Sequence, residues 1–283
     1  MTFTHRSLIS ELRALITIAW KEWVIFKRYP SWVIAIVIWP VLFPVGYIFT
    51  AKALGGPAGV DLAAFRALAG TEDYVSFIVI GSILWMWLNM TLWDAGLQLR
   101  NEQMRGTLES NWLCPVWRGS ILIGSSLTKL ATSLFCLAVS AVEFRLIYGI
   151  RLASGNPALL ALVFLLVIPI IYGIGITFAS LVLRFKEANA LVFLVRGVFM
   201  IFCGLTFPIE VLPGWMRSVA ACLPLTYAIR DIRAAILTNV TLAELMPDLT
   251  ILAGFALAMP ALGYILFLAT ERRSRRTGDL GQY

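Results

Sequence analysis

Residue types that carry out covalent or metal chemistry are scarce in this 283-residue chain. The single histidine, His5, lies near the N-terminus, which excludes most histidine-dependent metal sites and catalytic triads. Lys129 and Ser133 are four residues apart, a weak match to a serine–lysine hydrolase pair. The four cysteines show neither CxxC spacing nor a disulfide framework: Cys114, Cys136, Cys203 and Cys222. We therefore expect no catalytic residue and no metal site in this chain.

A polar segment that ends at Cys114-Pro115 carries two carboxylates at a helical spacing. Glu102 and Glu109 are seven residues apart, so they would share one face of a continuous helix. Gly106 favours a break, with Thr107 placed to cap a restarted helix. The residues alone leave two readings: a short amphipathic helix that takes force from a soluble partner, and a solvated loop.

Aromatic side chains repeat at helical spacing in two apolar stretches. Trp85, Asn89 and Trp93 recur every four residues, and Trp39 and Phe43 repeat in the same way. Such stripes could form an aromatic wall for an amphiphile, or simply pack against lipid or another helix. Arg196 lies about 15 Å inside another apolar stretch at 1.5 Å per residue, where an arginine is expected to face protein or water. These six residues form the candidate substrate path, and for Arg196 the alternatives are an ion pair, snorkelling and an anionic head group.

The composition indicates which elements must position these residues. The chain is 60% hydrophobic and 14% charged, whereas soluble domains are about 45–50% apolar and 25% charged. The sequence therefore predicts an all-α integral membrane protein, with apolar runs near the roughly 20 residues that cross a bilayer. Six membrane-spanning helices are predicted at 31–50, 73–93, 128–148, 157–183, 190–206 and 248–270.

The distribution of basic residues predicts the orientation of these spans. With both termini inside, 15 of the 23 lysines and arginines fall on the inner side and seven on the outer side. The positive-inside rule therefore favours cytoplasmic termini in a multi-pass protein of the cell membrane. The net charge of +7 is explained by this topology and does not predict a nucleic-acid partner.

Two amphipathic or interrupted segments flank the spans. Residues 7–28 place apolar residues on one face, which predicts a helix in the inner interface; packing on a soluble domain is the alternative. Residues 207–238 are apolar, but prolines divide them into pieces of about 10 and 15 residues, too short to cross. We expect a re-entrant helical hairpin in the outer leaflet, before the last span; a surface loop with two interfacial helices is the alternative.

Two sequence blocks resemble the type-2 ATP-binding-cassette (ABC) exporter permeases. The first is Glu102 with the run Gly106-Thr107-Leu108-Glu109 and Pro115. The second resembles the family block "SG…FP…LP…LPLTY…R" and begins at Cys203-Gly204, where Cys203 departs from the usual serine; Asn111-Trp112 is also unusual beside the first block. The order, the separation and the six spans fit as well, so the resemblance covers nearly the whole chain as one transmembrane domain, residues 1–283.

The resemblance implies roles for the residues that match. The coupling helix, in the region 99–115, would dock on the ATPase through Glu102, Arg105, Gly106, Thr107, Leu108 and Glu109. The outer gate would be formed within 207–238 by Phe207, Pro208, Glu210, Pro213, Pro224, Tyr227 and Arg233. No GxxxxGK[ST] loop occurs in the sequence, so the chain itself is not expected to be an enzyme or to hold a cofactor. ATP and Mg would be bound by a separate ABC ATPase subunit.

The resemblance also implies the function and the assembly. The family works as two permease subunits on two ATPase subunits, and the second permease is either identical or paralogous. The chain is expected to export an amphipathic or lipid-like substrate (a drug, a lipid or a lipid-linked glycan) from the cytoplasm or the inner leaflet by alternating access. The alternatives that we keep are a secondary transporter or channel and a structural subunit of a membrane complex. A secondary transporter or channel would not explain why the GTLE block and the proline-rich hairpin occur together.

Overall fold

A computed structural model describes residues 8–54, 62–71, 73–104, 118–149, 155–185, 188–238 and 240–277. Within these ranges every regular element is a helix, so the predicted all-α class is confirmed. The long helices are α1 (Leu8–Arg28), α2 (Pro30–Leu54), α4 (Tyr74–Met104), α6 (Arg118–Tyr148), α7 (Pro157–Phe185) and α11 (Leu242–Thr277). Shorter elements are α3 (Leu62–Ala69), α8 (Ala188–Phe202), η1 (Ile209–Val211), α9 (Gly214–Ala221) and α10 (Pro224–Leu237).

Five of the predicted spans form helices that are long and apolar enough to cross a membrane. Their apolar windows are Val33–Thr50, Tyr74–Asp94, Ser126–Tyr148, Pro157–Val182 and Leu242–Thr270, within the described residues. The sixth predicted span, 190–206, forms the shorter helix α8 of 15 residues. At 1.5 Å per residue α8 is about 22 Å long, less than the roughly 30 Å of a bilayer core. Cys203 and Gly204 follow it directly, and Gly204 has a φ of 66°, a conformation that suits glycine and ends a helix.

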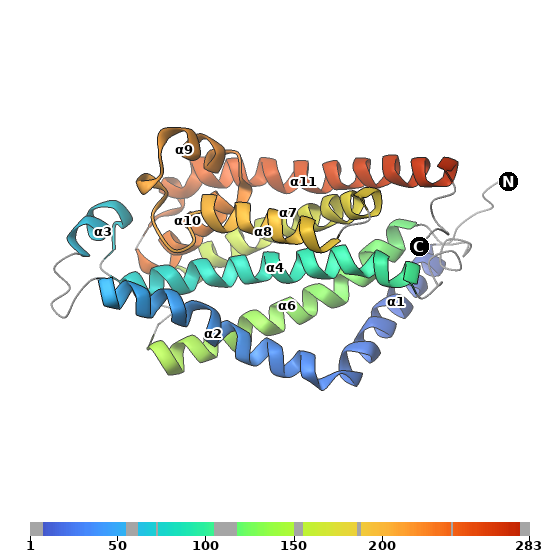
Figure 1. The fold of residues 1–283 in the computed structure, drawn as a ribbon, viewed down its shortest axis with the longest axis horizontal. Helices are drawn as coiled ribbons and strands as arrows, with labels where there is room; N and C mark the ends of the chain where they lie inside the picture. The colour runs from blue at the N-terminus through green and yellow to red at the C-terminus, as the bar shows by residue number, and fades with distance from the viewer. Residues whose placement is uncertain are drawn as a thin grey trace.

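The ends of the helices collect at two opposite ends of the bundle. The start of α1, the end of α4, the start of α6 and the end of α11 lie at one end, on the right of Figure 1. The short helices α3, α9 and α10 lie at the other end, on the left. We call these the termini end and the hairpin end. Helix α3 was not predicted; it lies within the segment 51–72 between the first two spans.

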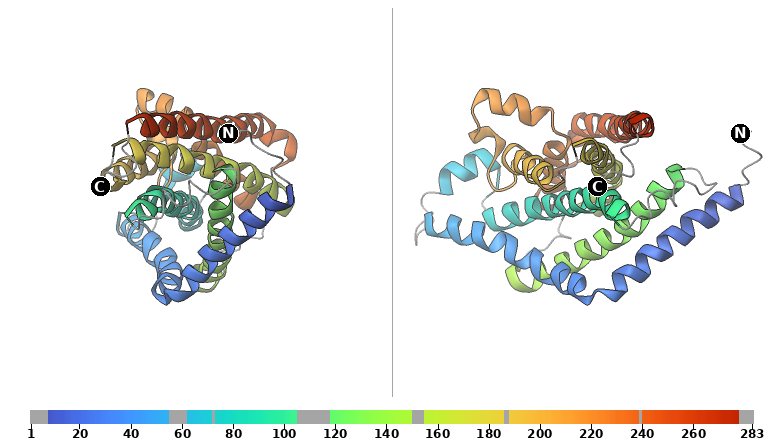
Figure 2. Two further views of the ribbon diagram at one scale, coloured as in Figure 1. Left: turned by 90° about the vertical axis from the view of Figure 1, so that its right-hand side faces the viewer. Right: turned by 45° about the vertical axis from the view of Figure 1, so that its right-hand side comes forward.

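Helix α4 is the central helix of the bundle. Buried residues make up 78% of its apolar window, but 44% of that of α7 and 22% or less of the others. Helices α2, α6, α7, α8 and α10 all contact it. On one side α7 and α11 pack closely, because Gly173 of α7 lies against the backbone of Met259 and Pro260. On the other side the amphipathic helix α1 runs along α6, as the views in Figure 2 show.

Candidate functional site

Three prolines divide the segment 207–238 into short helices. Pro208 and Pro213 immediately precede η1 and α9, and Pro224 is the first residue of α10, a position that tolerates the missing N–H. Helices α9 and α10 have 8 and 14 residues, about 12 and 21 Å, so neither alone could cross a bilayer. Both lie at the hairpin end in Figure 1. The structure divides the segment into η1, α9 and α10; a re-entrant hairpin in the outer leaflet stays a prediction.

Arg233 joins α10 to two other elements. Its Nε and Nη2 atoms donate to the Phe77 carbonyl of α4 at 3.1 and 2.9 Å. Its Nη1 donates to the Gly204 carbonyl at 2.7 Å and its Nη2 to the Leu205 carbonyl at 2.6 Å. These two carbonyls lie in the turn directly after α8, outside the hydrogen bonds of that helix. We call this set of contacts the Arg233 latch; it connects the hairpin to α4 and to the end of α8.

The other predicted gate residues take varied positions in the same region. Tyr227 donates its hydroxyl to the Ala221 carbonyl at 2.9 Å and so fastens α10 to the end of α9. Pro208 and Pro224 are buried, and Phe207 is half-buried. Glu210 and Pro213 are exposed. The structure thus places all seven residues in one compact segment, with buried residues that fix it and exposed residues free for contacts.

Sequence reasoning missed a charged cluster between α10 and α11. Arg230 of α10 forms an ion pair with Asp248 of α11. Beside it, Asp231 is fully buried, and neither of its carboxylate oxygens accepts a hydrogen bond within the described residues. Burial, followed by the negative charge of Asp248, raises the pKa of Asp231 to about 8. The signal in the sequence was an aspartate, Asp231, in a largely apolar segment. The neighbouring carboxylate, Asp248, lies on another helix, so the cluster could not be read from local sequence.

Four of the six residues of the candidate substrate path meet near the centre of the bundle. Phe43 of α2 stacks on Trp85 of α4, with ring centroids 4.4 Å apart. The guanidinium carbon of Arg196 on α8 lies 5.1 Å from the Trp85 centroid and 5.3 Å from that of Phe193. Trp93 packs edge-on against Phe193 at 5.8 Å. We call Phe43, Trp85, Trp93, Phe193 and Arg196 the aromatic arginine site.

The remaining two residues of the candidate path lie outside that site. Trp39 is 50% exposed on α2 and makes none of these ring contacts. Asn89 is half-buried on α4, and its side-chain oxygen has no hydrogen-bond partner within the described residues. A role of the stripe Trp85–Asn89–Trp93 in a substrate path stays a prediction. Phe193, which sequence reasoning missed, connects its two tryptophans through Arg196.

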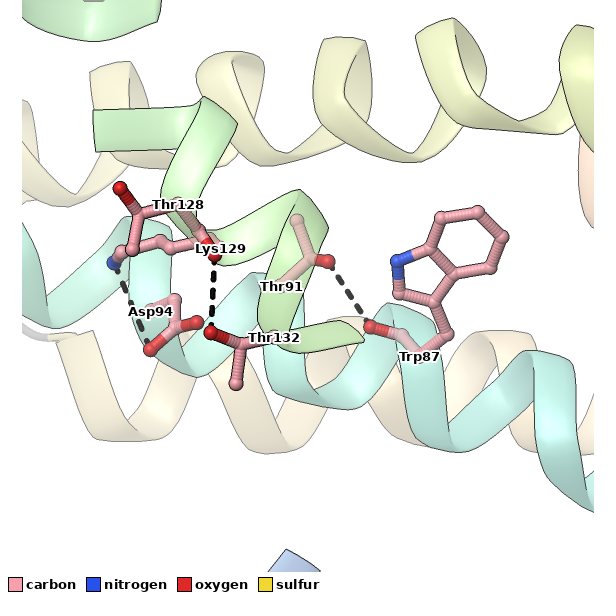
Figure 3. Close-up of polar contacts among 6 residues, drawn as sticks. All are labelled: Trp87, Thr91, Asp94, Thr128, Lys129 and Thr132. Carbon is pink, nitrogen blue, oxygen red and sulfur yellow. Dashed lines mark hydrogen bonds and ion pairs between the residues drawn. The ribbon is translucent and has the colours of Figure 1, made fainter. Parts of the chain in front are cut away.

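A polar layer links α4, α6 and α1 toward the termini end. Figure 3 shows Lys129 of α6 pointing to Asp94 of α4, at 3.6 Å between Nζ and Oδ1. Thr128 donates to the Ala19 carbonyl of α1 at 2.9 Å, which holds α1 against α6. Lys129 therefore pairs with a carboxylate rather than acting with Ser133, so the weak hydrolase pairing finds no support here.

The predicted coupling helix falls mostly outside the described residues. Glu102 lies in the last turn of α4, and its side chain is not among those described. Arg105, Gly106, Thr107, Leu108 and Glu109 lie outside the described residues altogether. Helix α4 itself is unbroken from Tyr74 to Met104, a length of about 46 Å at 1.5 Å per residue. One helix therefore connects the start of the predicted coupling segment to the Arg233 latch.

Comparison with known proteins assigns the chain to a family. Residues 13–237 match the ABC-2 type transporter family. The daunorubicin resistance ABC transporter permease protein DrrB1 of Streptomyces coeruleorubidus is 26% identical over 227 residues, 76% of this chain and 72% of that protein. A transport permease named ycf38 of Porphyra purpurea is 28% identical over 80% of this chain and 74% of its own length. A protein named for doxorubicin resistance, the ABC transporter permease DrrC of Mycobacterium tuberculosis, is 27% identical over 59% of this chain and 62% of its own length. The resemblance seen in the sequence is thereby confirmed.

Proposed function

The chain belongs to the ABC-2 type transporter family, and on this premise we propose that it is the membrane-spanning permease subunit of an ATP-driven exporter. Its cargo is an amphipathic or lipid-like molecule, such as a drug, a lipid or a lipid-linked glycan, that leaves the cytoplasm or the inner leaflet by alternating access. Two of the similar permeases are named for resistance to daunorubicin and doxorubicin, which supports an amphipathic cargo.

The observation that carries the proposal is the path of α4. This helix starts beside the Arg233 latch at the hairpin end and ends at Met104, next to the segment that resembles a coupling helix. It is the most enclosed of the long helices. A tilt imposed at its termini end would therefore reach the hairpin directly, as alternating access requires.

ATP hydrolysis belongs to a separate polypeptide in this proposal. The ABC ATPase subunit binds ATP and Mg and docks against Glu102 and residues 105–109. A second permease subunit, identical or paralogous, completes the translocation path, and the hairpins 207–238 form its outer gate. Membrane lipid surrounds the assembly, and the amphipathic helix α1 lies in the inner interface. The 33 large apolar side chains that are exposed on the described surface, such as Trp20 and Leu257, support contact with lipid or with a second permease.

The proposed location is the cell membrane, with both termini in the cytoplasm. Arg217 lies on α9 and Arg272 near the end of α11, and both are exposed. Helix α9 and the end of α11 lie at opposite ends of the bundle in Figure 1. Single cysteines at these positions, in a background without the native four, are labelled with a membrane-impermeant thiol reagent on intact cells. We expect labelling at position 217 alone; labelling at position 272 alone would reverse the topology.

Reconstitution tests the function. The chain is purified with its ATPase partner, placed in liposomes, and supplied with doxorubicin and a fluorescent phospholipid as probes. We expect ATP-dependent movement of at least one probe, and no ATP turnover by the permease alone. Glu109→Ala is expected to insert normally and to reduce transport or uncouple it from ATP turnover.

The two alternatives have distinct outcomes in the same liposomes. Movement that is driven by an ion gradient and indifferent to ATP would identify a secondary transporter or channel. A complex that binds the ATPase and moves no probe under either driving force would favour a structural subunit.

A further inference from the structure

Arg196 lies in the apolar part of the bundle, over aromatic rings from two helices, and a ring from a third helix stacks on one of them. Phe43 comes from α2, Trp85 from α4 and Phe193 from α8 itself. Trp85 is about 16 Å from the start of α4 at 1.5 Å per residue, near the middle of its apolar window Tyr74–Asp94. The Arg196 backbone is held as well, because its carbonyl accepts a hydrogen bond from Trp85 Nε1 at 3.2 Å. Arg196 therefore lies beside the middle of the apolar window of α4.

The donors of Arg196 contrast with those of Arg233. Arg233 uses Nε, Nη1 and Nη2 in four hydrogen bonds to three backbone carbonyls. Within the described residues, the guanidinium of Arg196 makes no hydrogen bond and no ion pair; its contacts are the faces of two rings. A guanidinium presents five N–H donors and stays charged at any physiological pH. Its donors therefore have no partner among the described residues, and burial of a charge in an apolar region is costly without a partner.

The surroundings of Arg196 indicate which charge a binding partner of its guanidinium would carry. Two described side chains beside it are neutral, Trp85 and Phe193, so its positive charge is not compensated locally. Tyr47, the nearby phenol on α2, already donates its hydroxyl to Met200 Sδ at 3.9 Å. Arg196 is half-buried and the neighbouring Phe193 is 59% exposed, so the site has an open side. A guanidinium fork matches two oxygens of a phosphate or a carboxylate, and aromatic faces receive apolar groups.

We propose that Arg196 binds the anionic head group, a phosphate or a carboxylate, of an amphiphile whose apolar part lies against the exposed ring of Phe193. Trp85 is 1% exposed and Phe43 stacks on it, so these two rings support the guanidinium from within the protein. A cationic head group is disfavoured at this position, because it would place a second positive charge beside the guanidinium. Of the two transport probes above, the phospholipid is therefore expected to use this site and the cationic doxorubicin is not. The class of ligand rests on the proposed function, since an exporter of amphiphiles has to hold its cargo between the two membrane surfaces. A resident membrane phospholipid has the same head-group chemistry and is distinguished from cargo by experiment.

Binding is measured on the full chain in a neutral maltoside detergent by equilibrium dialysis. The probe is radiolabelled dodecyl phosphate, and dodecyltrimethylammonium is the cationic control. We expect Arg196→Gln to weaken dodecyl phosphate binding by about 10-fold or more, the range of a charged hydrogen-bonding pair. Arg196→Lys keeps the charge without the fork and is expected to retain part of the affinity. Arg217→Gln, a matched change at an exposed arginine on α9, should leave binding unchanged.

A second measurement separates cargo from resident lipid. The permease–ATPase complex is placed in liposomes, and ATP turnover is recorded with and without dodecyl phosphate. Stimulation in the wild type that is absent in Arg196→Gln identifies a transport site. Unchanged turnover, together with one additional tightly held phospholipid per wild-type chain, identifies a lipid site. Either result supports anion binding at Arg196.

The proposal would be overturned if the wild type and Arg196→Gln bound dodecyl phosphate with equal affinity. It would also be overturned if Arg196→Gln weakened the binding of dodecyltrimethylammonium as much as that of dodecyl phosphate. Size-exclusion profiles and helical circular dichroism verify that the variants fold. If Arg196→Gln does not fold, Arg196→Lys replaces it in the comparison with the wild type. A complex that shows no ATP-driven transport would overturn the proposed function, but it would leave the dialysis result standing.

Discussion

Replacement of Arg233 by alanine would test whether the hairpin is fastened to the bundle as the structure indicates. The variant removes four hydrogen bonds and leaves the carbonyls of Phe77, Gly204 and Leu205 without this donor. A hydrogen bond from a charged donor contributes about 1.5–3 kcal/mol. The four bonds share one guanidinium and are not additive, and the cost of desolvating the cation offsets part of them. We therefore expect a loss of about 3–5 kcal/mol in the free energy of unfolding.

The loss is measured as a change in melting temperature in detergent. For domains of 150–250 residues a change of 1 kcal/mol shifts the midpoint by about 2–4 °C, so Arg233→Ala should melt roughly 6–20 °C lower. Arg233→Lys should recover little, because a single ammonium cannot reach all three carbonyls in the guanidinium geometry. Arg217→Ala on α9 is the matched control, since that side chain is exposed. A melting point of Arg233→Ala within about 2 °C of this control would refute the reasoning.

A chemical readout locates the loosening at the latch itself. Cys203 is 1% exposed and immediately precedes Gly204, one of the three acceptors, whereas Cys222 is exposed after α9. In a chain whose only cysteine is Cys203, this thiol should be protected from a thiol reagent when Arg233 is present and modified in Arg233→Ala. In a second chain whose only cysteine is Cys222, that thiol should react equally with and without Arg233. Continued protection of Cys203 in the variant would mean that other contacts hold the end of α8.

The remaining predictions concern a buried aspartate and an ion pair. Asp231→Asn should raise the melting point more at pH 8 than at pH 5. The folded state raises the pKa of Asp231 to about 8 from an ordinary value near 4, so the unfolded state releases the proton first and wild-type stability falls as pH rises between these values. An equal effect of Asp231→Asn at both pH values would contradict this cause. For Asp94 and Lys129, a double-mutant cycle with Asp94→Asn and Lys129→Met should give a coupling of about 0.5–1 kcal/mol, because the Asp94 side chain is 41% exposed and solvent screens the pair. A coupling above about 2 kcal/mol would mean that the pair is buried in the membrane-embedded protein.

Local sequence features determined much of the fold that the structure shows. Apolar runs of sufficient length predicted five long helices, because burial in lipid depends on composition over about 20 residues. Prolines at 208, 213 and 224 predicted where the hairpin breaks, since proline starts helices and ends the preceding ones locally. The length of α8 was overestimated, because hydropathy does not register the left-handed turn at Gly204 that ends it. Helix α3 was missed because eight residues are too few for a reliable periodic signal.

The candidate sites were less predictable, because their contacts join residues far apart in the chain. Arg233 was identified by its place in a family-like block, but its acceptor Phe77 is 156 residues away. The side chain of Lys129 suggested a partner four residues later, whereas its partner is Asp94 on another helix. Aromatic periodicity suggested that Trp85 and Trp93 share a wall, but the side chain that connects them is Phe193 of α8. The spacing of residues along one helix predicts which of them share a face. Which residues of other helices contact that face depends on how the helices pack.

The position of α4 explains how these separate contacts could work together. Helices α2, α7 and α11 contain internal prolines, where a helix can bend, and α4 contains none. Its weakest point is the Gly81-Ser82 pair, a sequence at which helices also kink. That point is covered, because a Cβ on Gly81 would collide with the Leu205 carbonyl and with the guanidinium of Arg233. The latch therefore lies against the part of α4 that is most able to bend. We expect α4 to move as a rigid rod while the proline-containing helices around it deform, so that a displacement at Met104 is passed to the hairpin.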